Sequence, residues 1–278
     1  MSVQSSQRVS RRRTMRRAAA KYAQFDQVPT EIGLRLIDHL LPVKICPERV
    51  LDVGAGTGRF TQALKALYTE ADIIAVDHSV QMLQRYRGKW PWQRRIRVCA
   101  QNEALPVKTA AAQVLTSNLG LSEGLPLDQA FAEFHRVLAP GGLLALSALG
   151  PDTFLELRRA WAGVSSIGAL PSFIDMHDLG DALVRAGFTD VVLDCERITV
   201  TYPNATEMLD ELTALGVTNT GPDRPKHLLT PRTRGRLEAD LNRHAAPLPL
   251  TLEVNFAHAW RPEGYNAQLV DIQGLSPR

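Results

Sequence analysis

Residues 51–60 read LDVGAGTGRF. A β-branched apolar segment leads into Gly54, Gly56 and Gly58, and an amphipathic segment follows. Glycine permits the backbone angles of a tight turn and lets a ligand approach the main chain closely. The stretch therefore predicts a strand, a ligand-binding turn and a helix, which together are the first unit of a parallel α/β sheet.

The segments around this turn alternate between strand-like and helix-like patterns from about residue 45 to residue 150. Short apolar runs such as DIIAVD (72–77) are separated by amphipathic ones. Strands that alternate with helices indicate βαβ units. We expect Pro140, Gly141 and Gly142 to end one helix, predicted over 128–138, and to begin the next strand.

After residue 150 the pattern becomes looser, but no linker interrupts it. It predicts a helix over 175–186 that Gly187 closes, a strand over 191–202, a helix over 205–215 and a last alternating strand over 251–260. Residues 217–236 contain three prolines, five Arg or Lys residues and one histidine, and they are predicted to form a loop.

Composition excludes several classes of protein. A chain of 278 residues with 45% hydrophobic content can bury a full core. The net charge of +3 is too small to indicate a nucleic-acid binder. Cys46, Cys99 and Cys195 form no C-x-x-C pair, which favours a reducing, cytoplasmic location and argues against a zinc site or a disulfide framework. No apolar run is long enough for a membrane span, and the start lacks a secretory signal.

The start of the chain is strongly basic. Seven Arg or Lys residues and no acidic residue lie between Arg8 and Lys21. This asymmetry favours an acidic partner, and a mitochondrial targeting segment is the alternative.

The turn and its acidic neighbours favour one type of ligand. The glycine spacing is G-x-G-x-G, whereas dinucleotide sites use G-x-G-x-x-G. Asp77 ends the next predicted strand, where a carboxylate can accept hydrogen bonds from both ribose hydroxyls. Asp52 and Asp77 would repel a pyrophosphate but suit a sulfonium or ammonium group, which indicates S-adenosylmethionine. The alternative is a turn used only for packing, with Asp77 as a cap of the helix that starts near Ser79.

With these features, residues 45–150 resemble a class I S-adenosylmethionine-dependent methyltransferase. The resemblance implies a Rossmann-like seven-stranded, mostly parallel sheet with helices on both faces and an antiparallel last strand, for which 251–260 is well placed. Within one domain, we expect a basic segment and lid helices over 1–44, the cofactor-binding core over 45–150, and substrate-side helices and final strands over 151–278. The expected cofactor-binding residues are Asp52, Gly54, Ala55, Gly56, Thr57, Gly58, Asp77, His78, Met82, Asn102, Glu103 and Asn118.

Segments outside the core make the resemblance specific to one family of methyltransferases. RRAAAKYAQFDQVPTEIGLRLIDHL, GPDTFLELRRAW and ITVTYPNATEMLDELTALGVTN are similar to the malonyl-acyl-carrier-protein O-methyltransferases that start pimeloyl synthesis for biotin. The substrate carboxylate of that family needs a cationic partner, for which Arg158 is the candidate. Because Arg159 is adjacent, only one of the two can face inward, and a solvated helix charge is the alternative. Tyr22 is expected to close the pocket and donate its hydroxyl, or else to be a core aromatic.

Two departures from the family pattern concern the substrate and the adenine. The family usually has Gln-Trp where this chain has Ser122 and Glu123, and Glu123 would place a negative charge near an anionic substrate. An acidic residue usually stands where this chain has Gln101 and Asn102, but an amide oxygen can still accept the adenine hydrogen bond. Two other functions stay open. The segments DT-x-x-ELR and DLG-x-x-L-x-RAGF are shared with mitochondrial complex I assembly factors that hydroxylate a protein arginine, and the change at Ser122 and Glu123 leaves a non-catalytic cofactor-binding scaffold open.

The resemblance implies an acidic acyl carrier protein as partner, and we expect a monomer. The dense positive clusters that fit such a partner are the segment 11–17 and the basic residues of the predicted loop, which are Arg224, Lys226, Arg232, Arg234 and Arg236. Asp175, His177 and Asp178 are read as a helix cap and surface charges rather than as metal ligands.

Overall fold

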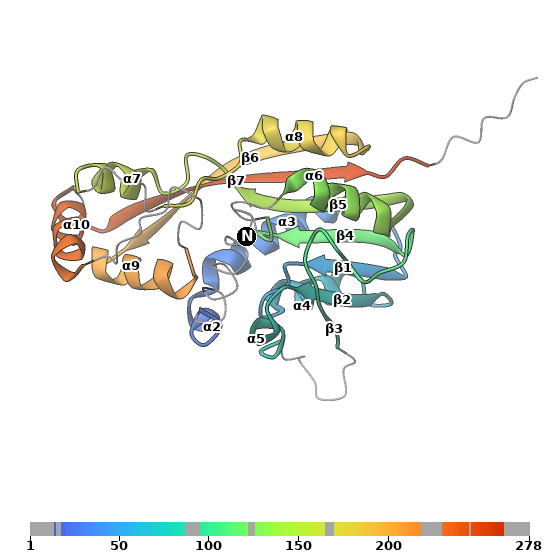
Figure 1. Cartoon of the computed structure of the whole chain (residues 1–278), viewed down its shortest axis with the longest axis horizontal. Coiled ribbons are helices and arrows are strands. Elements are labelled where there is room, and N and C mark those ends of the chain that lie inside the picture. Colours follow the sequence, from blue (N-terminus) through green and yellow to red (C-terminus); the bar gives the residue numbers. More distant parts are fainter. Residues whose placement is uncertain are drawn as a thin grey trace, which may run out of the picture.

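The computed structural model describes residue 14 and residues 18–86, 95–121, 126–164, 170–217, 230–244 and 246–263. Within these residues, seven strands form one sheet in the order β3-β2-β1-β4-β5-β7-β6. The strands are β1 (Arg49–Val53), β2 (Asp72–Asp77), β3 (Ile96–Cys99), β4 (Ala112–Asn118), β5 (Leu138–Leu149), β6 (Thr189–Tyr202) and β7 (Leu248–Trp260). Strand β7 runs antiparallel to its neighbours β5 and β6, and the other neighbouring strands pair in parallel (Figure 1). The predicted mostly parallel sheet with an antiparallel last strand is confirmed.

Helices cover both faces of the sheet, as the family resemblance implies. Apolar side chains of α3 (Gln27–Leu40), α4 (Arg59–Leu67), α7 (Leu155–Ala162), α9 (Ala205–Ala214) and α10 (Pro231–His244) share one buried cluster. Those of α6 (Leu127–Val137) and α8 (Met176–Arg185) form a second cluster on the opposite face. The short helices α2 (Tyr22–Phe25) and α5 (Val80–Leu83) lie below the sheet in the view of Figure 1, where α2 contacts α9 and α5 contacts β2 and β3. No helix in the described part of the chain is both long and apolar enough to cross a membrane.

The end of the predicted loop is helical instead. Residues 231–236 form the first turns of α10, and 218–229 lie outside the described residues. Pro231 suits the first helical position, where its missing N–H has no partner to lose. The hydroxyl of Thr230 accepts the N–H of Thr233 at 3.2 Å, and Leu237 is buried. The loop prediction over 217–236 is therefore wrong for its last residues, because the proline and basic residues there start an amphipathic helix.

The boundary between α6 and β5, near Pro140, also differs from the predicted one. Strand β5 begins at Leu138, directly after α6, so the residues Pro140, Gly141 and Gly142 lie inside the strand. The pairing with β4 is irregular there, and Gly141 has a φ of +72°. The expected helix end is therefore correct, but the strand starts before the glycines because the extra residues bulge out of the ladder.

We predict a large difference between two Gly-to-Ala substitutions. Gly58 has a φ of +80°, and a Cβ there would lie 2.1 Å from the Tyr86 ring. Gly58→Ala should lower the free energy of unfolding by about 2 to 4 kcal/mol through backbone strain and overpacking. The control is Gly235→Ala in α10, where a Cβ meets nothing within 4 Å. This change should raise the free energy by about 0.5 to 1 kcal/mol. Urea unfolding measures both values, and equal shifts would contradict the prediction.

Candidate functional site

The glycine-rich turn after β1 is fixed by the end of β2. Gly54 and Gly56 have φ angles of +82° and +54°, which favour glycine. The N–H groups of Gly54 and Ala55 donate to the carbonyl of Val76 at 2.8 and 3.0 Å. A Cβ on Gly54 would lie 2.7 Å from the Cα of Gly120. Gly54 therefore has room only for backbone, because it packs against the segment that follows β4.

Asp77 stands at the end of β2, with its side chain directed at this turn. Its Oδ2 accepts the N–H of Gly56 at 3.0 Å, and its Oδ1 accepts the N–H of Ser79 at 2.7 Å. The residue is only 6% exposed and lines a pocket. Ser79, and not Asp77, provides the side-chain cap of α5, because its hydroxyl accepts the N–H of Met82. Asp77 is therefore held in place by two amides and faces the pocket.

Asp52 lies beneath the turn and is 1% exposed. Its Oδ2 accepts the hydroxyl hydrogen bond of Thr61, and among the described residues its Oδ1 has no hydrogen-bond partner. Burial raises the pKa of Asp52 to about 7, and the nearby charge of Asp77 contributes to the rise. A cation bound above the turn would favour the ionised form of this carboxyl group. The arrangement thus fits a positively charged ligand.

The pocket brings eight of the predicted site residues together. They come from the lid, the turn and the ends of the parallel strands, and they are Tyr22, Gly54, Gly56, Asp77, His78, Met82, Asn102 and Asn118. The other predicted cofactor contacts lie outside its lining and stay predictions; they are Asp52, Ala55, Thr57, Gly58 and Glu103.

Two asparagines complete the cofactor side of the pocket. The Nδ2 of Asn118 donates to the carbonyl of Pro29 at 2.9 Å, and its Oδ1 accepts the hydroxyl of Ser147 at 2.7 Å. Asn102 is 7% exposed, and its Nδ2 donates to the carbonyl of Gly120 at 3.2 Å. Because its nitrogen is engaged, the oxygen of Asn102 is the atom that it can offer to an adenine amine.

The pocket continues into an apolar half, which is built by late parts of the chain. Its wall contains aromatic and aliphatic side chains that include Phe154, Phe173, Val200, Leu212 and Leu252. Tyr202 and Glu211 also line it, and the sequence analysis did not identify them. Nothing local marks these two residues, because they lie at the end of a strand and within an ordinary amphipathic helix.

Arg158 lies behind this wall. It is half-buried, while Arg159 is exposed, so Arg158 is the inward-facing residue of the two. The Nε and Nη2 atoms of Arg158 donate to the carbonyls of Thr153 and Pro171 at 3.0 and 2.7 Å. Its guanidinium carbon is 5.6 Å from the ring centre of Phe173. Pro171 and Phe173 line the pocket and Arg158 does not, so its charge lies one layer behind the surface.

Tyr22 lies at the junction of the two halves. Burial, and then the charges of Asp26 and Asp77, raise the pKa of its hydroxyl well above the usual range. The hydroxyl therefore stays protonated and can donate a hydrogen bond. The ring packs beside Met82, and α2 lies against α9.

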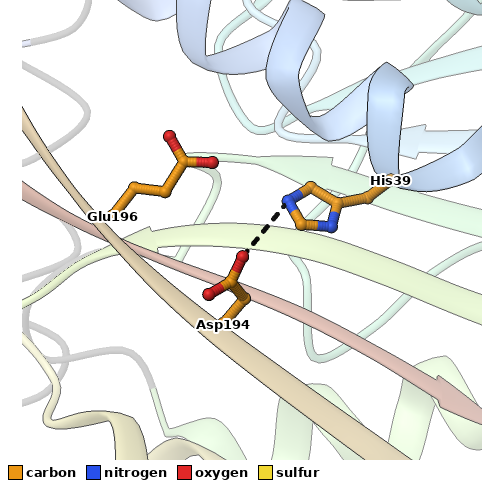
Figure 2. Close-up of side chains that lie close together, drawn as sticks. All are labelled: His39, Asp194 and Glu196. Atoms are coloured by element: carbon orange, nitrogen blue, oxygen red, sulfur yellow. Dashed lines mark ion pairs between the residues drawn. The ribbon is translucent and has the colours of Figure 1, made fainter.

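A second group of ionisable side chains lies outside the pocket. Atoms of His39, Asp194 and Glu196 that could bind a metal come within 4.8 Å of one another (Figure 2). Asp194 points toward His39, with 3.9 Å between Oδ2 and Nε2, and Glu196 forms an ion pair with Arg35. Since Arg35 already balances Glu196, we interpret the group as an ion-pair network between α3 and β6. Asp175 caps α8 by accepting the N–H of His177, as predicted.

Comparison with known proteins identifies the family. The chain is 41% identical to a malonyl-acyl-carrier-protein O-methyltransferase of Halorhodospira halophila, over 99% of this chain and 97% of that protein. A protein with the same name from Laribacter hongkongensis is 40% identical over 88% and 86% of the two chains. The chain belongs to the malonyl-acyl-carrier-protein O-methyltransferase family. Residues 50–142 also match the family model of a methyltransferase domain.

Solved structures agree with this fold. A Bacillus halodurans protein solved as a candidate methyltransferase has a TM-score of 0.59 at 17% identity, covering 83% of this chain and 98% of its own. The phosphoethanolamine N-methyltransferase 2 of Haemonchus contortus, solved with S-adenosyl-L-methionine, has a TM-score of 0.51 at 18% identity, covering 83% of this chain and 52% of its own. The predicted class I fold is confirmed. As a family member, the protein is an O-methyltransferase that uses S-adenosylmethionine.

We predict that Asp77 determines much of the cofactor affinity. Asp77→Ala should weaken binding of S-adenosylmethionine by about 1.5 to 3 kcal/mol, because charged hydrogen bonds to the ligand and to the turn are lost. Titration calorimetry measures the dissociation constant. Asp72→Ala, at the exposed start of the same strand, is the matched control and should change little. An unchanged dissociation constant in folded Asp77→Ala would exclude the ribose assignment.

Proposed function

We propose that this methyltransferase esterifies the free carboxylate of a malonyl group carried on acyl carrier protein, at the start of pimeloyl synthesis for biotin. The observation that carries the proposal is the continuous pocket that joins a cofactor side to an apolar half. Such a pocket suits a small anion on a long thioester arm. The names of the relatives support the same substrate.

Methyl transfer to a carboxylate requires little from the protein beyond binding the two reactants. When bound, S-adenosylmethionine supplies a methyl group that leaves the sulfonium for a carboxylate oxygen. A carboxylate is already ionised at neutral pH, so no general base is needed. The residues of the pocket have to align the two reactants and exclude water. The apolar wall and the lid residue Tyr22 serve these two purposes.

The cofactor fits the residues on the turn side of the pocket. We propose that Asp77 binds the ribose, that Asn102 accepts from the adenine amine, and that the backbone of Gly54 and Gly56 faces the ligand. Asp52 supports the cation from below the turn. Tyr22 donates its hydroxyl to the bound ligands, because its raised pKa keeps it protonated.

We propose that Arg158 provides the positive potential for the malonyl carboxylate. None of the described residues that line the pocket is a lysine or an arginine. The guanidinium of Arg158 lies behind Phe173, and the carbonyls of Thr153 and Pro171 hold it there. A charge held in a partly buried position is screened less by solvent than an exposed one.

The proposal predicts unequal effects for the two neighbouring arginines. Arg158→Ala should reduce methyl transfer by about 2 to 5 kcal/mol of transition-state free energy, and the exposed control Arg159→Ala by less than about 1 kcal/mol. Arg158→Lys should restore part of the rate, because it keeps the charge but loses the planar fork. The assay incubates labelled cofactor with malonyl carrier protein and measures the formation of a base-labile methyl ester.

If wild-type protein forms no such ester, the proposed substrate is wrong. The opposite order of the arginines would exclude Arg158.

The basic surface on α10 is the described part of the expected carrier-protein site. Arg232 and Arg236 are exposed and lie on one face of α10, as residues four apart do. Arg234 is bound by Asp210 and Glu238, both at 2.8 Å, so its charge is already balanced. Arg224, Lys226 and the segment 11–17 lie outside the described residues, except Thr14. We propose that Arg232 and Arg236 attract the acidic carrier protein.

This docking surface predicts a salt-dependent effect on one substrate only. Arg232→Glu with Arg236→Glu should raise the KM for malonyl carrier protein severalfold but leave a small malonyl thioester unaffected, because the reacting groups are unchanged. The KM of the wild type should rise as salt shortens the Debye length from about 10 to 3 Å. Arg185→Glu on α8 is the control, since α8 covers the opposite face of the sheet. Equal losses on both substrates would show that α10 shapes the pocket instead.

A further inference from the structure

The apolar half of the pocket contains one polar pair. The hydroxyl of Tyr202, at the end of β6, donates to Oε1 of Glu211 in α9 at 3.0 Å. Both residues line the pocket, and Tyr202 is only 7% exposed. Their neighbours in this wall are aliphatic, among them Val200, Leu212 and Leu250. A carboxylate in such a wall is costly unless it is hydrogen-bonded.

The pair is only partly satisfied by the protein. In the described part of the chain, the side chain of Glu211 forms no ion pair, and its one hydrogen bond is the one that Tyr202 donates. The neighbouring Asp210 points outward and binds Arg234. Burial raises the pKa of Glu211 and that of Tyr202, as expected for acids without a cationic partner. Oε2 of Glu211 thus has no hydrogen-bond donor among the described residues and offers a second acceptor position inside the pocket.

The chemistry of this acceptor restricts what part of the substrate can lie beside it. The malonyl carboxylate would be repelled by Glu211, so the reacting end must lie away from it, between the bound sulfonium and the positive potential of Arg158. The thioester arm of a carrier protein is a pantetheine chain, which alternates methylene groups with amide groups. Its methylenes match the aliphatic wall, and an amide N–H is the donor that a half-satisfied carboxylate requires.

We propose that Glu211, oriented by Tyr202, accepts a hydrogen bond from an amide N–H of the pantetheine arm. This inference rests on the proposed function and extends it, because it assigns the recognition of the arm to a residue of α9. Removing Glu211 should weaken binding of the arm without changing the reacting groups. Its effect should therefore appear in KM and leave kcat nearly unchanged.

The test compares two malonyl thioesters that differ in amides. Malonyl-pantetheine carries the amide groups, and the malonyl thioester of butanethiol carries none. Glu211→Ala should raise the KM for malonyl-pantetheine roughly tenfold or more, and should change the KM for the butanethiol ester less than about twofold. Glu211→Gln keeps an acceptor oxygen and should retain most of the affinity. Tyr202→Phe, which frees the orientation of Glu211, should have an intermediate effect. Asp210→Ala, one residue away and exposed, is the control and should have none.

Two outcomes would overturn the inference while the proposed function stands. Equal increases in KM for both thioesters would show that Glu211 only shapes the pocket. An effect of Asp210→Ala as large as that of Glu211→Ala would show that the surface of α9 is responsible. If the wild type methylates neither thioester nor malonyl carrier protein, the proposed function itself fails, and the inference fails with it. Circular dichroism and thermal melting of each variant establish that it is folded.

Discussion

The hydrogen bond from the Gly56 N–H to Asp77 is the contact on which the cofactor side depends. It joins the turn after β1 to the end of the parallel strand β2, and the carbonyl of Val76 binds the same turn one residue earlier. The contact is possible because β1 and β2 run in register and end at the same edge of the sheet. It also requires the positive φ of Gly56. The pairing of β1 with β2 therefore positions the Asp77 carboxylate, the glycine-rich turn and the cofactor side of the pocket together.

The substrate side is built in a different way, from parts of the chain that come much later. Its wall combines β6 and β7, which add to the edge of the sheet beside β5, with residues of α9 and with Phe154 at the start of α7. Phe173 separates the pocket from Arg158, and Glu211 lies on α9. A shared methyltransferase core can thus keep one cofactor site while the added elements determine the acceptor.

Local features predicted much of this structure, and contacts between distant segments account for the rest. The glycine spacing and the acid after the next strand identified the turn and Asp77, because both depend on neighbouring strands only. Helix geometry indicated that only one of Arg158 and Arg159 can face inward, but the burial that distinguishes them depends on the packing of α7. The pair of Tyr202 and Glu211 had no such signal, since only the packing of α9 on the sheet brings them to the pocket. The start of α10 was missed because proline and arginine there resemble a loop until the burial of Leu237 is known.

The lengths of the two last strands have a mechanical consequence. Strand β7 pairs with β5 only over residues 254–260, but it pairs with β6 as far as Leu248. Residues 248–253 and 197–202 therefore project from the sheet as a two-stranded ribbon, roughly 20 Å long at the rise of an extended chain (Figure 1). The outer edge of β7 in this ribbon is held by the segment that leads into α7, because the N–H groups of Gly150 and Phe154 donate to the carbonyls of Glu253 and Thr251 at 2.8 and 2.7 Å. The apolar half of the pocket is therefore braced by contacts that involve none of the parallel strands β1, β2 and β4 beside the cofactor.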